Sequence, residues 1–273
     1  MKWILLIILL LFLLYLFLIS PRLSFKKRMN AYEGVMFAHR GYHDIDQGIP
    51  ENSIPAFKRA IEHGYGIELD VHLTCDGEVV VFHDDSLKRI CGSTEIVETL
   101  TAKNLTNRNL SGTRERIPLF RDVLKLVNGQ VPLLIELKLP TKETDKLCSK
   151  VNDLLKAYTG PYLIQSFNTM GLKWYRSHAP HVLRGQLSSN LVKSDPDKPW
   201  VYRFAVKHML CNALGRPDFI SYKLLDLPNP SLGILKQFYK TPVAVWTLRT
   251  PSALRTGKKR YDMQIFENRC KKS

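Results

Sequence analysis

Nine short apolar runs, most of them separated by helical patterns, constrain the fold of this chain more than any other feature. The runs are rich in β-branched residues and have the length of strands: Val35–Ala38, Ile67–Val71, Val79–Phe82, Val131–Leu137, Tyr162–Ser166, Val182–Leu187, Phe219–Tyr222, Val243–Thr247 and Met263–Phe266. Helical periodicity fills several of the gaps: Ser53–His63, Leu119–Leu126, Thr141–Ala157 and Ser231–Tyr239. Strands that alternate with helices pair in parallel through right-handed crossovers. With this many strands in about 240 residues, we predict an α/β fold of the TIM type, an eight-stranded (β/α)8 barrel, in preference to an open doubly wound sheet.

The connection between the second and third runs is too short for a helical crossover. Only the five residues 74–78 lie between Leu73 and the next run, and they include Asp76-Gly77. Asp-Gly between two apolar runs is typical of a tight hairpin. We therefore expect an irregular early β-hairpin in the barrel. With Asp76 and Gly77 as the two loop residues, His83 lies opposite Asp70.

The first twenty residues differ in kind from the rest of the chain. Trp3 to Ile19 is a run of 17 apolar residues, which as a helix is ~26 Å long and can cross a thin hydrocarbon core. The alternative is a cleaved signal peptide, but only Lys2 precedes the run and no Ala-x-Ala-like cleavage site follows it. We therefore predict an uncleaved transmembrane helix at residues 1–20.

Positive charge is concentrated after this helix. Lys2 alone precedes it, whereas four basic residues follow it: Arg22, Lys26, Lys27 and Arg28. By the positive-inside rule, the rest of the chain then lies in the cytosol. Five scattered cysteines without a Cys-x-x-Cys pair agree with a reducing compartment. We expect a single-pass protein of the cell membrane, with an anchor (1–20), a basic juxtamembrane linker (21–32) and one cytoplasmic domain (33–273).

The whole chain is basic, with 40 Lys and Arg against 25 Asp and Glu and a net charge of +15. Such an excess suits nucleic acid, an anionic membrane surface or small phosphorylated substrates. Neither Gly-x-Gly-x-x-Gly nor Gly-x-x-x-x-Gly-Lys follows the first run, which weakens nucleotide-binding interpretations. The choice among these partners therefore depends on the polar residues of the strands.

Carboxylates interrupt two of the apolar runs. Glu68 and Asp70 alternate with apolar residues, so they share one strand face about 7 Å apart at ~3.4 Å per residue. A solvent-facing strand would account for this pair alone, but the run that ends in Glu136-Leu137-Lys138 is apolar on both faces until its last residues. A buried carboxylate costs several kcal/mol unless a cation or hydrogen bonds compensate it. We therefore predict that Glu68, Asp70 and Glu136 hold a hard divalent cation, Mg²⁺ or Ca²⁺.

Two histidines lie at the ends of predicted strands. The first run ends in His39-Arg40-Gly41, and catalytic groups of such barrels lie at the C-terminal ends of strands. Arg40 can bind a phosphate through two parallel hydrogen bonds, and Gly41 lets backbone approach a ligand closely. A lone histidine at a strand end is more often structural. His39 and His83, however, accompany an acidic cluster and an arginine, so both are candidate catalytic groups.

Further elements follow one another in a fixed order along the chain. They are His39-Arg40-Gly41, Pro50-Glu51-Asn52-Ser53 with Ala56-Phe57, Ile67-Glu68-Leu69-Asp70-Val71, Thr74-x-Asp76-Gly77, Val81-Phe82-His83-Asp84, Ile117-Pro118-Leu119, Leu134-Ile135-Glu136-Leu137-Lys138, Gln165-Ser166-Phe167-Asn168 and Val245-Trp246-Thr247. Together they resemble the glycerophosphodiester phosphodiesterase family, in particular a membrane-anchored member of bacterial type. The resemblance implies a TIM-type barrel that uses a divalent cation to hydrolyse glycerophosphodiesters to glycerol 3-phosphate and an alcohol.

The resemblance also implies roles for single residues. The family's two catalytic histidines fall on His39 and His83, and its metal carboxylates on Glu68, Asp70 and Glu136. Its phosphate-contacting residues fall on Arg40 and Lys138. Its supporting residues fall on Glu51, Asn52 and Trp246. One histidine takes a proton from the attacking hydroxyl and the other protonates the leaving alcohol, for which an imidazole with a pKa near neutrality is suited. In the family the attacker is thought to be the substrate's own glycerol hydroxyl, through a cyclic phosphate. The expected partners are a phosphodiester substrate and the membrane, and no nucleic acid.

Two stretches depart from the family pattern. The last strand of the family usually ends in Thr-Asp, whereas this chain reads Gln264-Ile265-Phe266-Glu267-Asn268, which leaves the part of the closing strand in the site open. The stretch Ser188–Gly215 contains few of the family's sequence motifs, and we expect it to be helical. It mixes basic and aromatic residues: Lys198, Trp200, Tyr202, Arg203, Phe204 and Lys207. It is either an ordinary barrel insertion with a solvated basic face or a lip that faces the membrane.

Two other functions remain open. An inactive, basic membrane- or lipid-binding module would be expected to lack part of the site, whereas the histidines and carboxylates are all present. The other is a different phosphodiesterase on the same scaffold and site: a lysophospholipase D that hydrolyses membrane lysophospholipids, or a phosphoinositide-type lipase. The anchor favours it, because tethering raises the effective concentration of leaflet lipids and each basic residue after the helix can add ~1 kcal/mol of attraction to anionic lipid.

Overall fold

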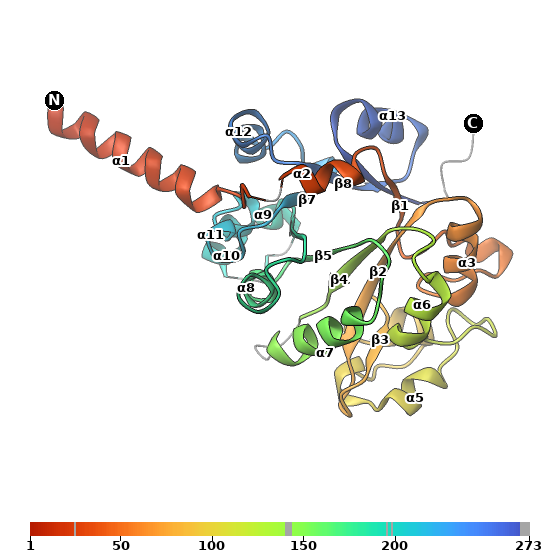
Figure 1. Ribbon diagram of the computed structural model, residues 1–273. Helices are drawn as coiled ribbons and strands as arrows, with labels where there is room; N and C mark the ends of the chain where they lie inside the picture. The colour runs from red at the N-terminus through yellow and green to blue at the C-terminus, as the bar shows by residue number, and fades with distance from the viewer. Residues whose placement is uncertain (25, 140–143, 195, 198, 268–273) are drawn as a thin grey trace.

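A closed barrel of eight parallel strands forms the body of the protein (Figure 1). The computed structural model describes residues 1–273 except 25, 140–143, 195, 198 and 268–273. Around the barrel the strands are β1 (Met36–Ala38), β2 (Gly66–Leu73), β4 (Leu133–Leu137), β5 (Tyr162–Ser166), β6 (Arg184–Ser188), β7 (Phe219–Lys223), β8 (Val243–Leu248) and β9 (Met263–Phe266), and β9 pairs back to β1. The ninth strand, β3 (Val79–Val81), pairs antiparallel with β2. The predicted TIM-type barrel is confirmed, and each of the nine apolar runs contains a strand.

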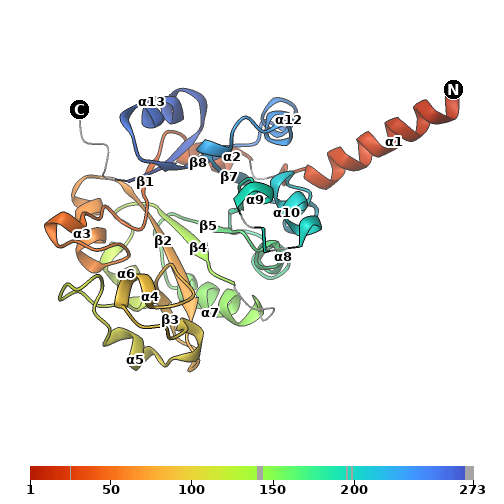
Figure 2. The ribbon, with the colours of Figure 1, turned by 180° about the vertical axis from the view of Figure 1, so that it is seen from behind.

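Helices surround the barrel (Figures 1 and 2). They are α3 (Ile54–Glu62), α6 (Phe120–Val127), α7 (Thr144–Lys156), α8 (Thr169–His178), α9 (Leu191–Ser194), α10 (Trp200–Lys207), α11 (Asn212–Gly215), α12 (Pro230–Tyr239) and α13 (Pro251–Arg260). The four predicted helices correspond to α3, α6, α7 and α12, although Thr141, where one of them was expected to begin, lies outside the described residues. The basic, aromatic stretch forms α9 to α11, and its Lys198 also lies outside them.

Side chains alternate between the two faces of each strand, and those that face the barrel interior fill two parts of it. The lower part, towards the N-terminal ends of the strands, is apolar, and the upper part, towards their C-terminal ends, is polar. The lower part is one cluster of buried side chains: Met29, Tyr32, Phe37, Leu134, Leu163, Leu183, Phe219, Ala244, Met263 and Ile265. Two residues beyond Leu134 on β4, the same strand face carries Glu136. The parallel register sets Glu136 between Asp70 of β2 and Gln165 of β5. The predicted acidic residues therefore lie in the barrel interior, towards the C-terminal ends of the strands.

The hairpin after β2 is present, but its predicted register is wrong by one residue. The loop has the five residues 74–78, because the strands pair as Val71 with Val81, His72 with Val80 and Leu73 with Val79. Thr74 closes this wider loop: its N–H donates to Glu78 O and its Oγ1 accepts from Glu78 N–H, each at 2.9 Å. Asp70 therefore faces Phe82, whose N–H donates to Asp70 O at 3.0 Å. His83 lies one residue further along.

The segment between β3 and β4 builds a small second core beside the barrel. It contains α4 (Lys88–Cys91), η3 (Val97–Thr99), α5 (Ala102–Thr106) and α6. The buried residues of this second core are Val80 of β3 and, from the segment, Phe82, Leu87, Ile90, Val97, Leu105, Leu110 and Ile117. The buried side chains of α6 belong to the main core instead. Since His83 and Asp84 lie at the start of this segment, the second core supports their backbone.

The N-terminal helix α1 (Lys2–Ile19) leaves the body on the side formed by α10, α11 and α12 (Figures 1 and 2). Within the described part of the chain it is the one helix long and apolar enough to cross a membrane, and most of it is exposed. Its last residue, Ile19, is instead buried in the main core. The helix and the body are therefore joined by packing and not only by the chain.

The basic segment after α1 contacts the barrel at the N-terminal ends of several strands. It contains α2 (Lys26–Met29) and η1 (Asn30–Tyr32). Arg22 forms an ion pair with Asp218 at 2.6 Å, and Arg28 donates to His181 O at 2.7 Å. Two of the basic residues expected to attract lipid thus bind the protein itself. The division of the chain at residues 20 and 32 stays a prediction.

Candidate active site

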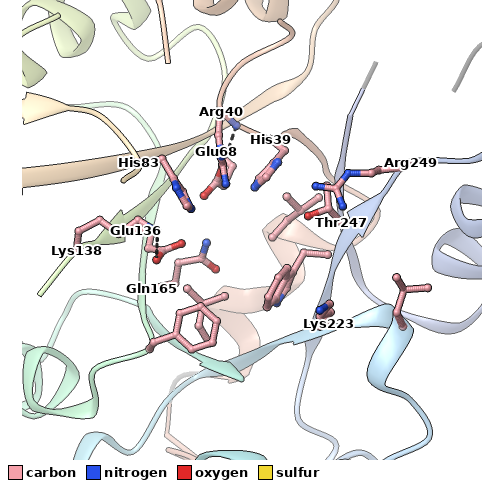
Figure 3. A pocket seen from close by; sticks show the side chains of 15 residues that line it. His39, Arg40, Glu68, His83, Glu136, Lys138, Gln165, Lys223, Thr247 and Arg249 are labelled. Atoms are coloured by element: carbon pink, nitrogen blue, oxygen red, sulfur yellow. Dashed lines mark hydrogen bonds and ion pairs between the residues drawn. The ribbon is translucent and has the colours of Figure 1, made fainter. Parts of the chain in front are cut away.

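The C-terminal ends of the barrel strands surround a pocket of about 320 Å³ (Figure 3). Seven of the predicted site residues line it: His39, Arg40, Glu68, His83, Glu136, Lys138 and Trp246. The other lining residues are Gln165, Phe167, Leu187, Lys223, Leu225, Thr247, Arg249 and Ile265. The remaining predicted residues, Glu51, Asn52 and Asp70, bond to residues of the lining: Glu51 and Asn52 to Arg40, and Asp70 to Lys138. The structure therefore brings all ten predicted residues into one site.

Three buried carboxylates form the centre of the site. Glu68, Asp70 and Glu136 each offer an oxygen, and these oxygens lie within 4.8 Å of one another. Burial raises the pKa of Glu68 well above its ordinary value, and the charges of Asp70 and Glu136 raise it further. Burial also raises the pKa of Glu136, although Lys138 opposes this. The cluster is thus crowded with like charge, and binding a cation would relieve the repulsion.

The positive side chains of Lys138 and Arg40 offset part of the negative charge of the carboxylate cluster. Lys138 Nζ contacts Glu136 Oε1 at 2.6 Å and Asp70 Oδ1 at 3.1 Å. Burial would raise the pKa of Asp70, but the charges of Lys138, His83 and Arg40 outweigh it and hold that pKa well below its usual range. The backbone N–H of Arg40 donates to Glu68 Oε2 at 2.9 Å. The ammonium group of Lys138 is therefore fixed by the cluster itself, whereas the guanidinium of Arg40 lies 3.8 Å from Asp70 Oδ2 and is held by Glu51 at 2.7 Å.

The loop after β1 is shaped by residues 51 and 52. Asn52 takes a left-handed backbone conformation (φ 52°), which asparagine tolerates better than most residues. Its N–H donates to Arg40 O at 2.8 Å and its Nδ2 to Asp70 at 3.0 Å. Glu51 accepts from Arg40 Nη1 at 2.7 Å. Gly41 also permits close packing on α3, because a Cβ there would lie 2.9 Å from Ala56 Cβ; its role in letting backbone approach a ligand stays a prediction.

His39 is held by a carboxylate that directly follows the closing strand β9. Its Nδ1 lies 2.9 Å from Glu267 Oε1, and Arg249 binds the same carboxylate through two hydrogen bonds of 2.7 and 2.8 Å. Burial would raise the pKa of Glu267, but the bonds to His39 and Arg249 keep it well below its usual range. An ionised carboxylate only accepts, so His39 Nδ1 carries the proton. Burial lowers the pKa of His39 to about 4, so the ring is neutral at pH 7 with a free lone pair on Nε2.

His83 is held by its own neighbour in the sequence. Its Nδ1 lies 2.6 Å from Asp84 Oδ1, and Arg89 binds Asp84 at 2.7 and 2.9 Å. Arg89 also binds Glu51 through two further hydrogen bonds. Burial alone would raise the pKa of Glu51, but the bonds from Arg89 and the charge of Arg40 lower it to about 2. His83 is therefore linked to Arg40 through a chain of charged groups.

The opposite wall of the pocket is largely apolar. Phe167 and Trp246 meet edge to face with ring centroids 5.8 Å apart, and Leu187 and Leu225 join them. Figure 3 shows Lys223 across the pocket from His83. Trp246, predicted as a supporting residue, belongs to this wall. The pocket thus offers a charged side to a phosphate and an apolar side to the organic part of a ligand.

Sequence reasoning did not assign Glu267, Arg249, Asp84 or Arg89 to the site. Asp84 stood beside His83 in a quoted motif, so adjacency could have found it. Glu267 lies 228 residues from His39, and only closure of the barrel brings the two together. The closing strand, whose part was left open, therefore contributes a site residue. Asn268, which follows Glu267, lies outside the described residues.

The carboxylate cluster fits a divalent cation by its donor set. Magnesium and calcium prefer oxygen ligands and are bound by clustered carboxylates. Glu68, Asp70 and Glu136 offer three such oxygens from adjacent strands, in a buried position at the side of the pocket. These three residues would hold the ion. With two imidazoles nearby, the arrangement suits proton transfer to and from oxygen atoms of a phosphate ester.

Comparisons with known proteins agree with this site. The glycerophosphoryl diester phosphodiesterase family matches residues 39–269. A glycerophosphodiester phosphodiesterase of Caldanaerobacter subterraneus is 34% identical over 163 residues, which cover 56% of this chain and 66% of that protein. The human lysophospholipase D GDPD1 is 28% identical over 162 residues, or 55% of this chain and 49% of that protein. The chain thus aligns with about two thirds of the bacterial relative and about half of the human one.

Solved structures agree on the fold. A phosphodiesterase of Oleispira antarctica, in complex with the product sn-glycerol-3-phosphate, superposes with a TM-score of 0.71 at 21% identity, over 88% of this chain and 94% of that one. A glycerophosphodiester phosphodiesterase of Thermotoga maritima has a TM-score of 0.64 at 26% identity, over 85% of this chain and 93% of that one. The family match spans most of the chain and includes both histidines and all three carboxylates. The chain therefore belongs to the glycerophosphoryl diester phosphodiesterase family, whose members are phosphoric diester hydrolases.

Proposed function

We propose that the protein hydrolyses glycerophosphodiesters to glycerol 3-phosphate and an alcohol, using a divalent cation and two histidines. The observation that carries the proposal is the pocket itself. Two imidazoles, each with Nδ1 bound to a carboxylate, share it with three clustered carboxylates and with Arg40 and Lys138. Family membership supports the same reaction. An inactive lipid-binding module would have no need of this complete set.

His39 and His83 divide the proton transfers between them. His39 is neutral at pH 7, so its Nε2 can take the proton from the attacking hydroxyl as the bond to phosphorus forms. His83 then gives a proton to the alcohol oxygen as its bond to phosphorus breaks; because the attacker is the substrate's own glycerol hydroxyl, a cyclic phosphate remains. Water then opens the ring with the roles reversed: His83 takes a proton from the water and His39 returns its proton to the glycerol oxygen, which gives glycerol 3-phosphate. Glu267 and Asp84 hold the two rings and stabilise the positive charge that each carries when protonated.

Arg40 and Lys138 hold the phosphate during this exchange. Both are cations fixed by carboxylates, so they reach the substrate with little loss of side-chain entropy. A cation bound by Glu68, Asp70 and Glu136 would offset the negative charge on the phosphoryl oxygens and so ease attack at phosphorus. Magnesium and calcium both suit these ligands.

The test is an assay of the full-length protein on glycerophosphocholine and glycerophosphoglycerol, with and without a chelator. We expect turnover to require the cation, and Glu136→Gln to abolish both turnover and its dependence on the cation. Glu33→Gln is the matched control, because Glu33 is exposed and outside the pocket. Full turnover in excess chelator would contradict the metal. No hydrolysis of any diester at saturating cation would contradict the function.

Lysophospholipase D-type hydrolysis is a second candidate for the same pocket. Leu225 is 80% exposed at the pocket rim, where an acyl chain could pass, and a human lysophospholipase D is among the relatives. The test compares kcat/KM for a lysophospholipid and its deacylated counterpart, with the full-length protein in vesicles. A strong preference for the deacylated compound there would exclude the lipid substrate and leave the soluble one.

The proposal includes α1 as an uncleaved membrane anchor with the barrel in the cytosol. Support comes from the apolar length of α1 and from its last turn, where Ile19 is fully buried; cleavage after Ser20 would remove that core residue. The positive residues after the helix favour the cytosolic side. Protease added outside intact cells should leave the barrel whole. Digestion from outside, or a mature chain that begins after Ser20, would reverse this assignment.

A further inference from the structure

The end of α1 is fixed to the barrel by side chains that cap its carbonyl groups. Asn212 Nδ2 donates to Ile19 O at 2.8 Å, Tyr239 Oη to Leu16 O at 3.0 Å, and Arg216 Nη1 to Phe17 O at 2.8 Å. The Arg216 guanidinium also lies over the Phe17 ring, 4.4 Å from its centroid. These bonds satisfy carbonyls that a helix end leaves without partners. These contacts between the last turn of α1 and the barrel therefore set the direction in which α1 leaves the body.

Because the last turn of α1 is embedded, only part of the helix is left to cross a bilayer. Residues 2–14 are exposed, whereas Tyr15 and Leu16 are half-buried and Ile19 is buried. Thirteen helical residues span about 20 Å, and a hydrocarbon core is about 30 Å thick. If α1 crosses the membrane, the parts of the body around its last turn lie in the interfacial layer, or the bilayer thins around it.

The elements around that turn expose large apolar side chains. Trp200, Val201 and Phe204 lie on α10, Leu214 on α11 and Phe238 on α12. Trp200 and Phe204 stack at 5.1 Å, and Phe204 contacts the His208 ring at 4.4 Å. Tryptophan and phenylalanine beside basic residues are typical of a membrane interface. We call these five apolar residues the apolar flank.

Hydrogen bonds join the end of α10 to α1 through Ser231 on one side and, on the other, to Asn229 in the segment that follows the pocket rim. His208 Nδ1 lies 3.2 Å from Ser231 Oγ, which accepts from Tyr15 Oη of α1 at 2.8 Å. Asn229, which caps α12, donates to Lys207 O at the end of α10 at 3.0 Å. Asn229 follows η4 (Leu224–Asp226), the turn that carries the exposed rim residue Leu225. α1, the apolar flank and the rim thus belong to neighbouring elements, and Figures 1 and 2 show α1 leaving the body beside α10 and α12.

We propose that the apolar flank is the surface by which the barrel lies on the lipid bilayer, so that leaflet lipids reach the pocket past Leu225. The proposal rests on the membrane anchor described above. The occupant is lipid, because α1 itself continues the surface and is apolar all round. The flank lies at the side of the barrel from which α1 departs, so the protein rests on the membrane by its side.

Tryptophan fluorescence in vesicles tests the contact directly. The full-length protein is placed in vesicles of phosphatidylcholine and phosphatidylglycerol, with and without lipids brominated near the headgroup. The fluorescence of Trp200, on α10, is the difference between the wild type and Trp200→Phe. The fluorescence of Trp3, on α1, is the difference between the wild type and Trp3→Phe. Ile96→Trp, on the segment between β3 and β4, is the control away from α1. We expect bromolipid to quench the signals of Trp200 and Trp3 and to leave the signal at position 96 unquenched.

The outcomes separate the flank from the anchor. Quenching of Trp3 without quenching of Trp200 would overturn the flank and keep the anchor. Quenching of neither would overturn both. Equal quenching at positions 200 and 96 would also overturn the flank, because contact would then lack a preferred side.

Activity gives the second measurement. Trp200→Ser/Val201→Ser/Phe204→Ser should lower kcat/KM for lysophosphatidylglycerol in these vesicles about tenfold, since membrane contact scales with apolar area. It should leave hydrolysis of soluble glycerophosphoglycerol unchanged, which also shows that the variant folds. Ile45→Ser/Ile96→Ser is the matched control, because each residue is 43% exposed and neither is on the flank. Equal loss on both substrates would overturn the proposal. A wild-type protein inactive on both diesters would instead defeat the proposed function, and the fluorescence would still decide the flank.

Discussion

His39 and His83 mark two regions of the pocket that are built alike and buried differently. On the β1–β9 side, His39 binds Glu267, and Arg249 holds the carboxylate. On the β3 side, His83 binds Asp84, and Arg89 holds the carboxylate. The side chains of His39 and Glu267 are 12% and 10% exposed, against 30% and 23% for His83 and Asp84. The chain has therefore placed one imidazole away from water and left the other closer to it.

In the proposed mechanism, this difference in burial is the basis for assigning the two chemical roles. Burial keeps His39 neutral at physiological pH, as a group that accepts a proton must be. The side chain of His83 is the more exposed of the two, so solvent can reach it. The β3 region is also tied to Arg40, because Arg89 bonds to Glu51 and Glu51 bonds to Arg40. The β1–β9 region depends on closure of the barrel.

Removing either imidazole should have the largest effect. We expect His39→Ala and His83→Ala each to lower kcat by at least ~10²-fold, because general acid–base groups contribute about that much. Thermal unfolding and far-ultraviolet circular dichroism of both variants should match the wild type. A variant with near wild-type kcat would remove that histidine from the mechanism and make the two regions unequal in function.

Removing the carboxylates should cost less and should distinguish the regions. We expect Glu267→Gln to lower kcat about 10- to 100-fold, the usual cost of losing a group that orients a functional histidine. Asp84→Asn should lie at the lower end of that range, since water can replace part of the bond at the more exposed site. Asp122→Asn, on the exposed face of α6, is the control. A larger loss in Asp84→Asn than in Glu267→Gln would show that burial does not decide the importance of the bond.

Most of the contacts in the β3 region could be predicted from the sequence, and few of those in the β1–β9 region could. Apolar runs fixed the strand positions, because each must fill either the barrel interior or the space under a helix. Glu68, Asp70 and Glu136 could be predicted because a carboxylate in an apolar run has few explanations. His83 and Asp84 are neighbours, so their bond is a local property. Glu267 could not be paired with His39, because no local pattern records which strand closes a barrel.

Two further differences arise from side chains that compete with simple patterns. The hairpin register shifted because Thr74 closes a five-residue loop in place of the two-residue turn that Asp-Gly favours. The basic residues after α1 were predicted to attract anionic lipid, yet Arg22 forms an ion pair with Asp218, 196 residues away. A charge run shows which groups are available and not which partner they take. In both cases a contact outside the pattern decided the outcome.

The arginines behind the two carboxylates should matter less than the carboxylates. Arg249 and Arg89 are about half exposed, and ion pairs of this kind contribute up to about 1 kcal/mol, which corresponds to about a fivefold change in rate. We expect Arg249→Gln to reduce kcat about twofold and Arg89→Gln about fivefold, because Arg89 holds Glu51 as well as Asp84. Steady-state kinetics on one soluble diester measures both. Loss of cation binding in Arg89→Gln, without a change in kcat, would show that Arg89 acts through the carboxylate cluster instead.

The smallest expected effect is a displacement of the pH profile in Glu267→Gln. If His39 must be neutral to accept the proton, kcat/KM falls as the pH drops through the pKa of His39, which burial lowers to about 4. The hydrogen bond and charge of Glu267 raise that pKa, so their loss should lower it further. The acid limb of Glu267→Gln should therefore move to lower pH even though its maximal rate is reduced. The profile is measured at saturating cation, where the carboxylate cluster is held ionised, and Arg249→Gln serves as the control because it retains Glu267. A limb that stays in place, or moves to higher pH, would mean that another group is the base and that the burial of His39 serves a different purpose.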